Sequence, residues 1–219
     1  TDWMDGISPP SSPGVRMLKT ELVAPKSLAA AVAGSAAIGA AGNLTVATPQ
    51  VSANGPVDLT LAATGDLVLA STGAAVAGQT PPAAGASLEF IGANVTVDTH
   101  VRSPSGQVNV TATNGNVTLG SSALIDVSGF SQTFLTKTVS ADGGAVSLIA
   151  NLGGIDIRNG ATIDVSAGTG QGSGGSVALR APSGGVTIAG TMNGKGGKSG
   201  HGASLLVDTE TFLGAAHAM

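Results

Sequence analysis

Cysteine and tyrosine are absent from this chain, and aromatic residues make up only 2% of its 219 residues. The absence of cysteine excludes a disulfide framework, a thiolate metal site and a cysteine nucleophile. Aromatic side chains normally fill part of the core of a globular domain of this size, so their scarcity argues against a compact globule. The apolar residues are mostly Ala, Val, Leu and Ile, which are small enough to stack in a narrow interior.

Charge is scarce as well, at 10% of the residues, and the formal net charge is −4. The basic residues do not cluster, so no nucleic-acid partner is expected. High apolar content and low net charge disfavour disorder. The longest apolar stretch, Ser27 to Ala41, is mostly alanine and falls short of the roughly 18–20 residues of a membrane span. The opening residues, Thr1 to Pro13, are acidic and proline-rich, unlike a secretory signal.

Short runs of alternating apolar and polar residues recur from about Asn43 onward. In one of them Val177 and Leu179 fall on one face of a strand, and Ala178 and Arg180 fall on the other. Gly, Asn, Ser or Pro bounds each run, which is typical of strands separated by tight turns.

The runs also form ordered sets. Residues of one set match residues 38 positions later, and these match residues a further 31 positions on. The matches are Val108 with Val146 and Val177, Val117 with Ile155 and Val186, Ile125 with Ile163, and Asp126 with Asp164. The pattern predicts an all-β fold, a right-handed parallel β-helix (solenoid) with three short strands per coil. A β-sandwich is the alternative, but it would not need successive sets to keep strand order and residue identity in step.

This interpretation divides the chain into three parts. Residues 43-211 are the predicted β-helix repeat region, residues 1-42 a non-repetitive Pro/Ala-rich leader, and residues 212-219 a tail. The leader is a candidate cap for the first coil, with Trp3 as its anchor. Phe130 to Ala141 is the largest insertion and is predicted to project as a loop. The tail is too short to cover the last coil, so an open edge is predicted there.

Three segments carry a family resemblance: Gly143 to Ala150, Gly160 to Gly168 and Gly174 to Ala181. Their repeat style resembles the filamentous-haemagglutinin-like exoproteins of two-partner secretion, over about Asn43 to Thr209. The resemblance implies a β-helical rod, export through an outer-membrane secretion pore, and an adhesive role outside the cell or on the bacterial outer-membrane surface. The Asn-Pro motifs of that family's secretion domain are absent, and position 1 is not methionine, so the chain is expected to be the repeat region of a longer protein.

Two acidic residues are the strongest candidates for chemistry. Asp126 and Asp164 occupy equivalent positions in neighbouring sets, so adjacent coils would bring their carboxylates within about 5 Å. Polysaccharide-cleaving β-helices use such pairs together with Arg or Lys. No basic residue recurs in register with them, so they are predicted to accept hydrogen bonds from turn amides instead.

Other motifs have a structural interpretation beside the functional one. Met192 to Ser199 resembles a phosphate-binding loop, but methionine replaces the first glycine and no helix is expected to follow, so no nucleotide partner is predicted.

The alternation of apolar and polar residues by itself generates the four Asn-x-Thr triplets, which are also candidate glycan acceptors. The histidines share no metal-ligand spacing. The triplets begin at Asn43, Asn94, Asn109 and Asn116, and the histidines are His100, His201 and His217.

The sequence therefore predicts no catalytic, cofactor-binding or metal residue, and a chain that is not an enzyme. The expected function is that of a structural shaft segment of a secreted bacterial surface protein, with an adhesion or filament/matrix role. Its receptor is not identified by the sequence, and self-association through open ends is a candidate interaction. Two alternatives stay open: a β-helical polysaccharide-active enzyme, and a shaft that carries a downstream toxin domain.

Overall fold

The computed structural model of the protein describes residues 14–16, 21–23, 28–30, 34–53, 57–73 and 84–214. These residues form an all-β structure without a helix. The strands up to residue 112 are β1 (Gly14–Arg16), β2 (Glu21–Val23), β3 (Leu28–Ala30), β4 (Gly34–Ala40), β5 (Leu44–Ala47), β6 (Gln50–Ala53), β7 (Val57–Ala63), β8 (Leu67–Ala70), β9 (Ser87–Gly92), β10 (Val95–Asp98), β11 (His100–Arg102) and β12 (Gln107–Ala112). The later strands are β13 (Val117–Leu119), β14 (Leu124–Asp126), β15 (Ser131–Phe134), β16 (Lys137–Ser140), β17 (Ala145–Ala150), β18 (Ile155–Ile157), β19 (Thr162–Asp164), β20 (Ser176–Ile188), β21 (Thr191–Asn193) and β22 (Ser204–Gly214).

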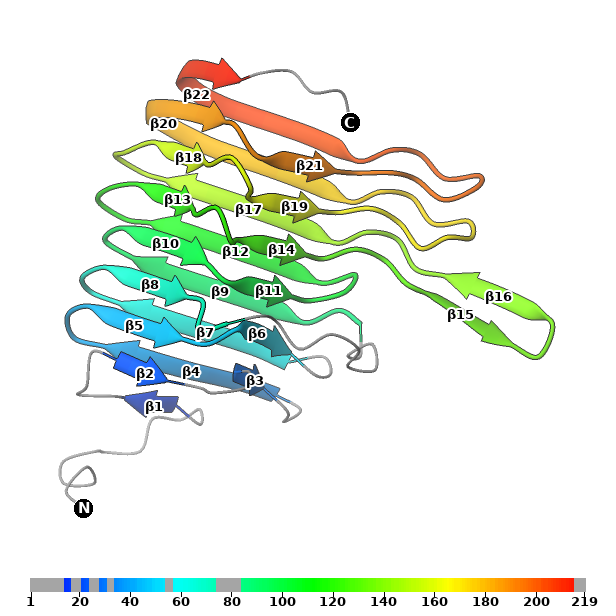
Figure 1. The fold of residues 1–219 in the computed structure, drawn as a ribbon, viewed down its shortest axis with the longest axis horizontal. Helices are drawn as coiled ribbons and strands as arrows, with labels where there is room; N and C mark the ends of the chain where they lie inside the picture. Colours follow the sequence, from blue (N-terminus) through cyan, green and yellow to red (C-terminus); the bar gives the residue numbers. More distant parts are fainter. Residues whose placement is uncertain are drawn as a thin grey trace.

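Most strands pair in parallel. The largest sheet has the order β1-β4-β7-β9-β12-β17-β20-β18-β13-β10-β8-β5-β2, with β22 also paired to β20, and a second sheet has the order β21-β19-β14-β11-β6-β3. The long strand β20 joins the two arms of the large sheet, because its first part pairs with β17 and its last part pairs with β18. The strands stack in chain order, from β1–β3 at one end to β22 at the other (Figure 1).

The pairing of equivalent residues predicted from the repeat is confirmed. Val146 lies between Val108 and Val177, and Ile163 is the register partner of Ile125. We call such a chain of register partners a column. Because a strand has a side-chain period of two, every column lies wholly on one face of its sheet.

The inward columns form the core. Val177 and Leu179 are buried, whereas Arg180 is exposed, as predicted. The buried side chains are almost all aliphatic, and Phe90 is the largest of them. Burying one such side chain contributes about 1.5–3 kcal/mol. A continuous aliphatic stack thus replaces the aromatic core of a globule.

Strand pairing extends beyond the predicted repeat region on both sides. Strand β4 lies before residue 43 and pairs along its whole length with β7, and β22 continues past residue 211. The predicted cap anchor, Trp3, and residues 215–219 of the predicted tail lie outside the described residues.

One strand pairing differs from the simple repeat. Strand β6 pairs directly with β11, so Val51 is the register partner of Val101. In the described ranges no strand lies between β8 and β9 to separate them. The sequence between β8 and β9 contains Pro81 and Pro82, which lack the backbone N–H that a ladder needs. At this place the Thr99 hydroxyl donates a hydrogen bond to the Thr48 carbonyl, 2.6 Å away.

The predicted projecting segment is confirmed and is an antiparallel hairpin of β15 and β16. Figure 1 shows it extending away from the stacked strands. Its base is held by a bond between the Ser131 and Ser140 hydroxyls, 2.8 Å apart, and by the Ala141 amide, which donates to the Phe130 carbonyl. The hairpin therefore leaves the stack at a defined point.

A column of glycines marks the corner that precedes β12, β17 and β20. Gly106, Gly144 and Gly175 occupy equivalent positions there, each directly before the first residue of its paired strand. A Cβ atom on Gly144 would lie 2.1 Å from the Gly106 carbonyl oxygen, and one on Gly175 would lie 1.7 Å from the Gly144 carbonyl oxygen. At Gly144 and Gly175 a side chain would therefore collide with the backbone of the preceding strand set.

Candidate functional site

The two predicted carboxylates lie side by side. Asp126 and Asp164 end strands β14 and β19 and are register partners. In each case Oδ1 accepts a hydrogen bond from the amide two residues later: Ser128 N to Asp126 at 3.0 Å and Ser166 N to Asp164 at 2.9 Å. Both bonds are local turn bonds, which confirms the predicted structural role.

A basic residue does lie in register with this pair, so the prediction that none recurs there is wrong. Arg102 on β11 is the register partner of Asp126, and its Nε lies 3.4 Å from Asp126 Oδ2. The two side chains are 33% and 23% exposed. The segment between β11 and β14, Ser103 to Ala123, differs in length from the segments between the later paired strands. A comparison at constant offsets therefore missed Arg102. The column Arg102–Asp126–Asp164 therefore combines two predicted polar residues with one that the repeat comparison missed.

Three of the four Asn-x-Thr triplets share a corner of the fold. The side-chain oxygen of Asn43 accepts from the Asp66 amide at 2.9 Å, that of Asn94 from the Asn116 amide at 2.9 Å, and that of Asn116 from the Gly154 amide at 2.8 Å. Each bond links one strand set to the next, so the asparagines brace the corner. The side-chain amide of Asn94 is also engaged, because it donates to Asp66 Oδ1 at 2.8 Å.

The fourth triplet is different. Asn109 lies within β12, half-buried, between its register partners Glu89 and Ser147. It therefore sits in the middle of a sheet face and not at a turn. Modification of any of the four asparagines stays a prediction.

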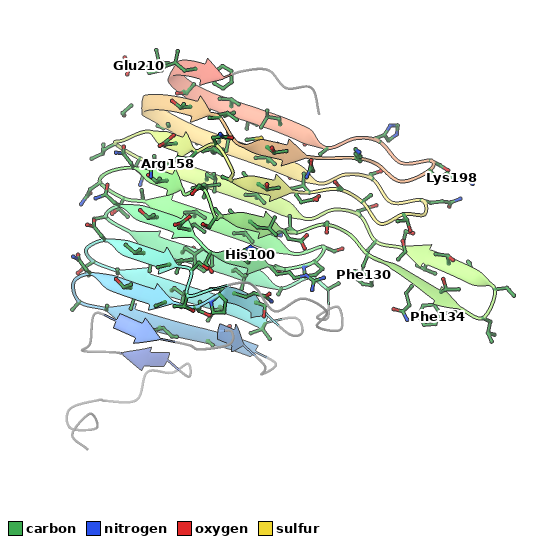
Figure 2. All side chains as sticks on the ribbon, viewed as in Figure 1. His100, Phe130, Phe134, Arg158, Lys198 and Glu210 are labelled. Atoms are coloured by element: carbon green, nitrogen blue, oxygen red, sulfur yellow. The ribbon has the colours of Figure 1, made fainter. Side chains whose placement is uncertain are left out.

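The loop that resembles a phosphate-binding loop is followed by strand β22 and not by a helix. Its amides point to a neighbouring loop: Gly197 N donates to the Gly172 carbonyl, and Lys198 N donates to the Gly170 carbonyl. Lys198 lies at the outer end of this loop (Figure 2). Because these amides are already bonded to protein, the loop does not have the phosphate cradle that the motif requires.

The histidines are not brought together into a site. His100 lies on β11, with Gln50 and Leu124 as register partners, and His201 is exposed in the loop before β22. His217 lies outside the described residues. Within the part of the chain that the structure describes, no group of three His, Cys, Asp or Glu residues could hold a metal ion.

The hairpin carries a feature that the sequence patterns did not reveal. Register places the pair Thr133 and Thr138 on one face, and the pairs Phe134–Lys137 and Gln132–Val139 on the other. Phe134 is 61% exposed, Val139 is 52% exposed, and Leu135 at the turn is fully exposed. Figure 2 shows Phe134 on the part of the hairpin remote from the stack. The hairpin therefore exposes two apolar side chains at its tip, Phe134 and Leu135, and a third, Val139, on the same face as Phe134.

Leu135 is also strained. Its φ angle of 54° lies in the left-handed region, which bulky residues rarely adopt and which costs about 1–2 kcal/mol. Leu135 is the first residue of the two-residue loop between Phe134 and Lys137, and such hairpin turns require a positive φ at this position, so the strain belongs to the turn.

In the described ranges no helix is long and apolar enough to cross a membrane. Comparison of the chain with protein-family models, with curated proteins and with solved structures gave no match.

Proposed function

We propose that the chain is a right-handed parallel β-helix with three strands per coil, and that it serves as a structural shaft segment of a secreted bacterial surface protein. One observation carries this proposal. Aliphatic columns continue through the stack, as in the buried series Leu88, Val108, Val146 and Val177. Each coil then contacts only its neighbours, and the length of the rod grows with the number of coils.

The location and role follow from the resemblance. Filamentous-haemagglutinin-like exoproteins imply export through an outer-membrane secretion pore and a position outside the cell or on its surface. On such a shaft the hairpin of β15 and β16 is the element suited to adhesion, because its exposed Phe134 and Leu135 project from the rod. The chain itself is proposed to carry no enzymatic activity.

Insertion of extra coils tests the shaft directly. Ala145 and Ser176 are register partners, so Ala145 to Gly175 is one complete unit of 31 residues. Three further copies inserted after Gly175 should fold and lengthen the stack by about 14 Å, since neighbouring strands lie about 4.8 Å apart. Circular dichroism would report the β-structure, and small-angle scattering would report the added length.

The matched control inserts three copies of the same 31-residue unit in which the buried residues Val146, Leu148 and Ile163 are replaced by aspartate. This protein should lose the cooperative melting of the parent chain, because each inserted unit would place unpaired charges in the core. If the two insertions behaved alike, or if the 31-residue units added no length, the shaft proposal would be wrong.

Polysaccharide cleavage is the second candidate, favoured by the column of Arg102, Asp126 and Asp164. Polygalacturonate, alginate or hyaluronan incubated with the purified chain should release no unsaturated or reducing ends, because both Oδ1 atoms are already held by turn amides. If the chain releases such ends, and Asp126→Asn or Asp164→Asn abolishes the release without changing the melting temperature, the chain is an enzyme and the shaft proposal is wrong.

A further inference from the structure

The apolar tip of the hairpin lies beside a positive charge. Phe134 and Lys137 are register partners on either side of the two-residue turn that begins with Leu135. Lys137 is exposed and is the only charged residue from Phe130 to Ala141. The outermost part of the hairpin therefore combines two exposed apolar side chains with one cation and no anion.

Two neighbouring loops, one after β19 and one after β21, extend from the same corner of the fold as the hairpin. The Gly170 amide of the first loop donates a hydrogen bond to the Ser140 hydroxyl of the hairpin, 2.9 Å away. The Lys198 amide of the second loop donates to the Gly170 carbonyl. The three segments thus project from the stack as one layered unit (Figure 1). We call this unit the ridge, and it comprises residues 129–141, 165–175 and 194–203.

The ridge is positively charged on a chain whose net charge is −4. It contains no Asp or Glu. The carboxylate of Asp142, at its base, accepts a hydrogen bond from the Ser173 amide at 2.7 Å. Figure 2 shows Lys198 and Phe134 on one side of the stack and Arg158 on the opposite side. All the lysines that the structure describes are exposed and lie on the ridge: Lys137, Lys195 and Lys198.

An anionic phospholipid bilayer is the partner that fits both properties of the ridge. Apolar side chains on a projecting tip can enter the boundary between headgroups and acyl chains, and cations beside them attract anionic lipids. An acidic polysaccharide would be attracted by the same lysines. It would gain nothing from Leu135, which is fully exposed and has no hydrogen-bonding group in its side chain. The combination of an apolar tip and flanking cations therefore favours the bilayer.

We propose that the ridge binds the surface of an anionic phospholipid bilayer. Phe134 and Leu135 insert between the headgroups, and Lys137 contacts their phosphates. Lys195 and Lys198 add attraction from the neighbouring loop. Insertion is shallow because only two apolar residues form the tip, so binding is reversible and weakens as salt screens the lysines. The inference rests on the proposed adhesive role of the hairpin and names its target.

The apolar part of the proposal is tested with vesicles of phosphatidylcholine and phosphatidylglycerol in equal parts. The full chain should sediment with them across a lipid concentration series, and less with vesicles of phosphatidylcholine alone. Leu135→Asn should weaken binding about tenfold. Asparagine tolerates a positive φ better than leucine does, so the melting temperature should not fall. The matched control is Leu152→Asn, because Leu152 is 64% exposed but lies in a turn away from the ridge, and its binding should equal that of the parent chain.

The charged part is tested by neutralising one cation at a time. Lys137→Gln should weaken binding to the mixed vesicles about fivefold, the effect of one lysine near an anionic surface. Arg158→Gln removes an exposed cation on the opposite side of the stack and should leave binding unchanged. If the two variants weaken binding equally, the attraction is general and the ridge is not the binding site.

Insertion itself is tested with a tryptophan at the tip. The chain has a single tryptophan, Trp3, so a chain with Trp3→Phe and Phe134→Trp reports on the tip alone. Brominated acyl chains in the mixed vesicles should quench its fluorescence, and unquenched binding would exclude insertion.

Two further outcomes would overturn the proposal. Failure of the parent chain to sediment with the mixed vesicles at low salt is one of them. The other is retention on immobilised alginate that depends on the lysines and not on Leu135, which would identify an acidic polysaccharide as the target. If the inserted coils lengthen the stack but the vesicles do not bind, this inference is wrong and the shaft stands.

Discussion

Leu148→Asp should prevent the chain from folding into its cooperative structure. Leu148 is fully buried, with Val110 and Leu179 as its register partners. The change removes a leucine from the stack and leaves a carboxylate without a partner, at a combined cost of about 5 kcal/mol or more. Natural domains are stable by only about 5–15 kcal/mol. Urea denaturation followed by circular dichroism would measure the loss.

The matched control is Ser147→Asp, one residue earlier on the same strand. Ser147 is half-buried on the outward face, between Asn109 and Ala178. Its carboxylate would be hydrated, so the free energy of unfolding should change by no more than about 0.5 kcal/mol. Comparable losses at both positions would show that the assignment of inward and outward faces is wrong.

Among the glycines that the structure describes, Gly175 should be the one at which substitution by alanine is most damaging. The new Cβ atom would lie 1.7 Å from the Gly144 carbonyl oxygen. That oxygen belongs to the backbone of the neighbouring strand set and cannot rotate away, so the two sets must separate at the corner. We expect a loss of at least about 3 kcal/mol in the free energy of unfolding, at the upper end for overpacked sites.

Gly202→Ala is the control, since Gly202 lies in the corner before β22, next to Ala203, which is the register equivalent of Gly175. Its Cβ atom would approach only the Gly194 carbonyl oxygen, at 3.5 Å. The same glycine-to-alanine change should therefore be neutral or slightly stabilising, because alanine restricts the unfolded chain. Thermal melting of the two variants side by side checks this. A melting temperature for Gly175→Ala equal to that of Gly202→Ala would contradict the tight corner.

The sequence alone indicated strands and their faces from about Asn43 onward, and the partners of the strands that contain Val108, Val117, Ile125 and their later equivalents. A strand has a side-chain period of two, so alternation assigns each residue to a face without knowledge of the fold. The recurrence of Val108, Ile125 and Asp126 at constant offsets then assigned register, because a slip by one residue would turn every inward valine outward. The turn role of Asp126 and Asp164 followed from the same information, since their bonds reach only two residues along the chain.

Only the tertiary structure revealed the contacts between strand sets that are joined by turns of unequal length. Arg102 meets Asp126, and β6 meets β11, because the lengths of the intervening segments place them together. The tight corner at Gly175 likewise depends on the distance to a carbonyl of another set. Local patterns carry no information about such distances. The apolar tip at Leu135 was hidden for a related reason: alternation looks the same on a strand that leaves the stack as on one that lies within it.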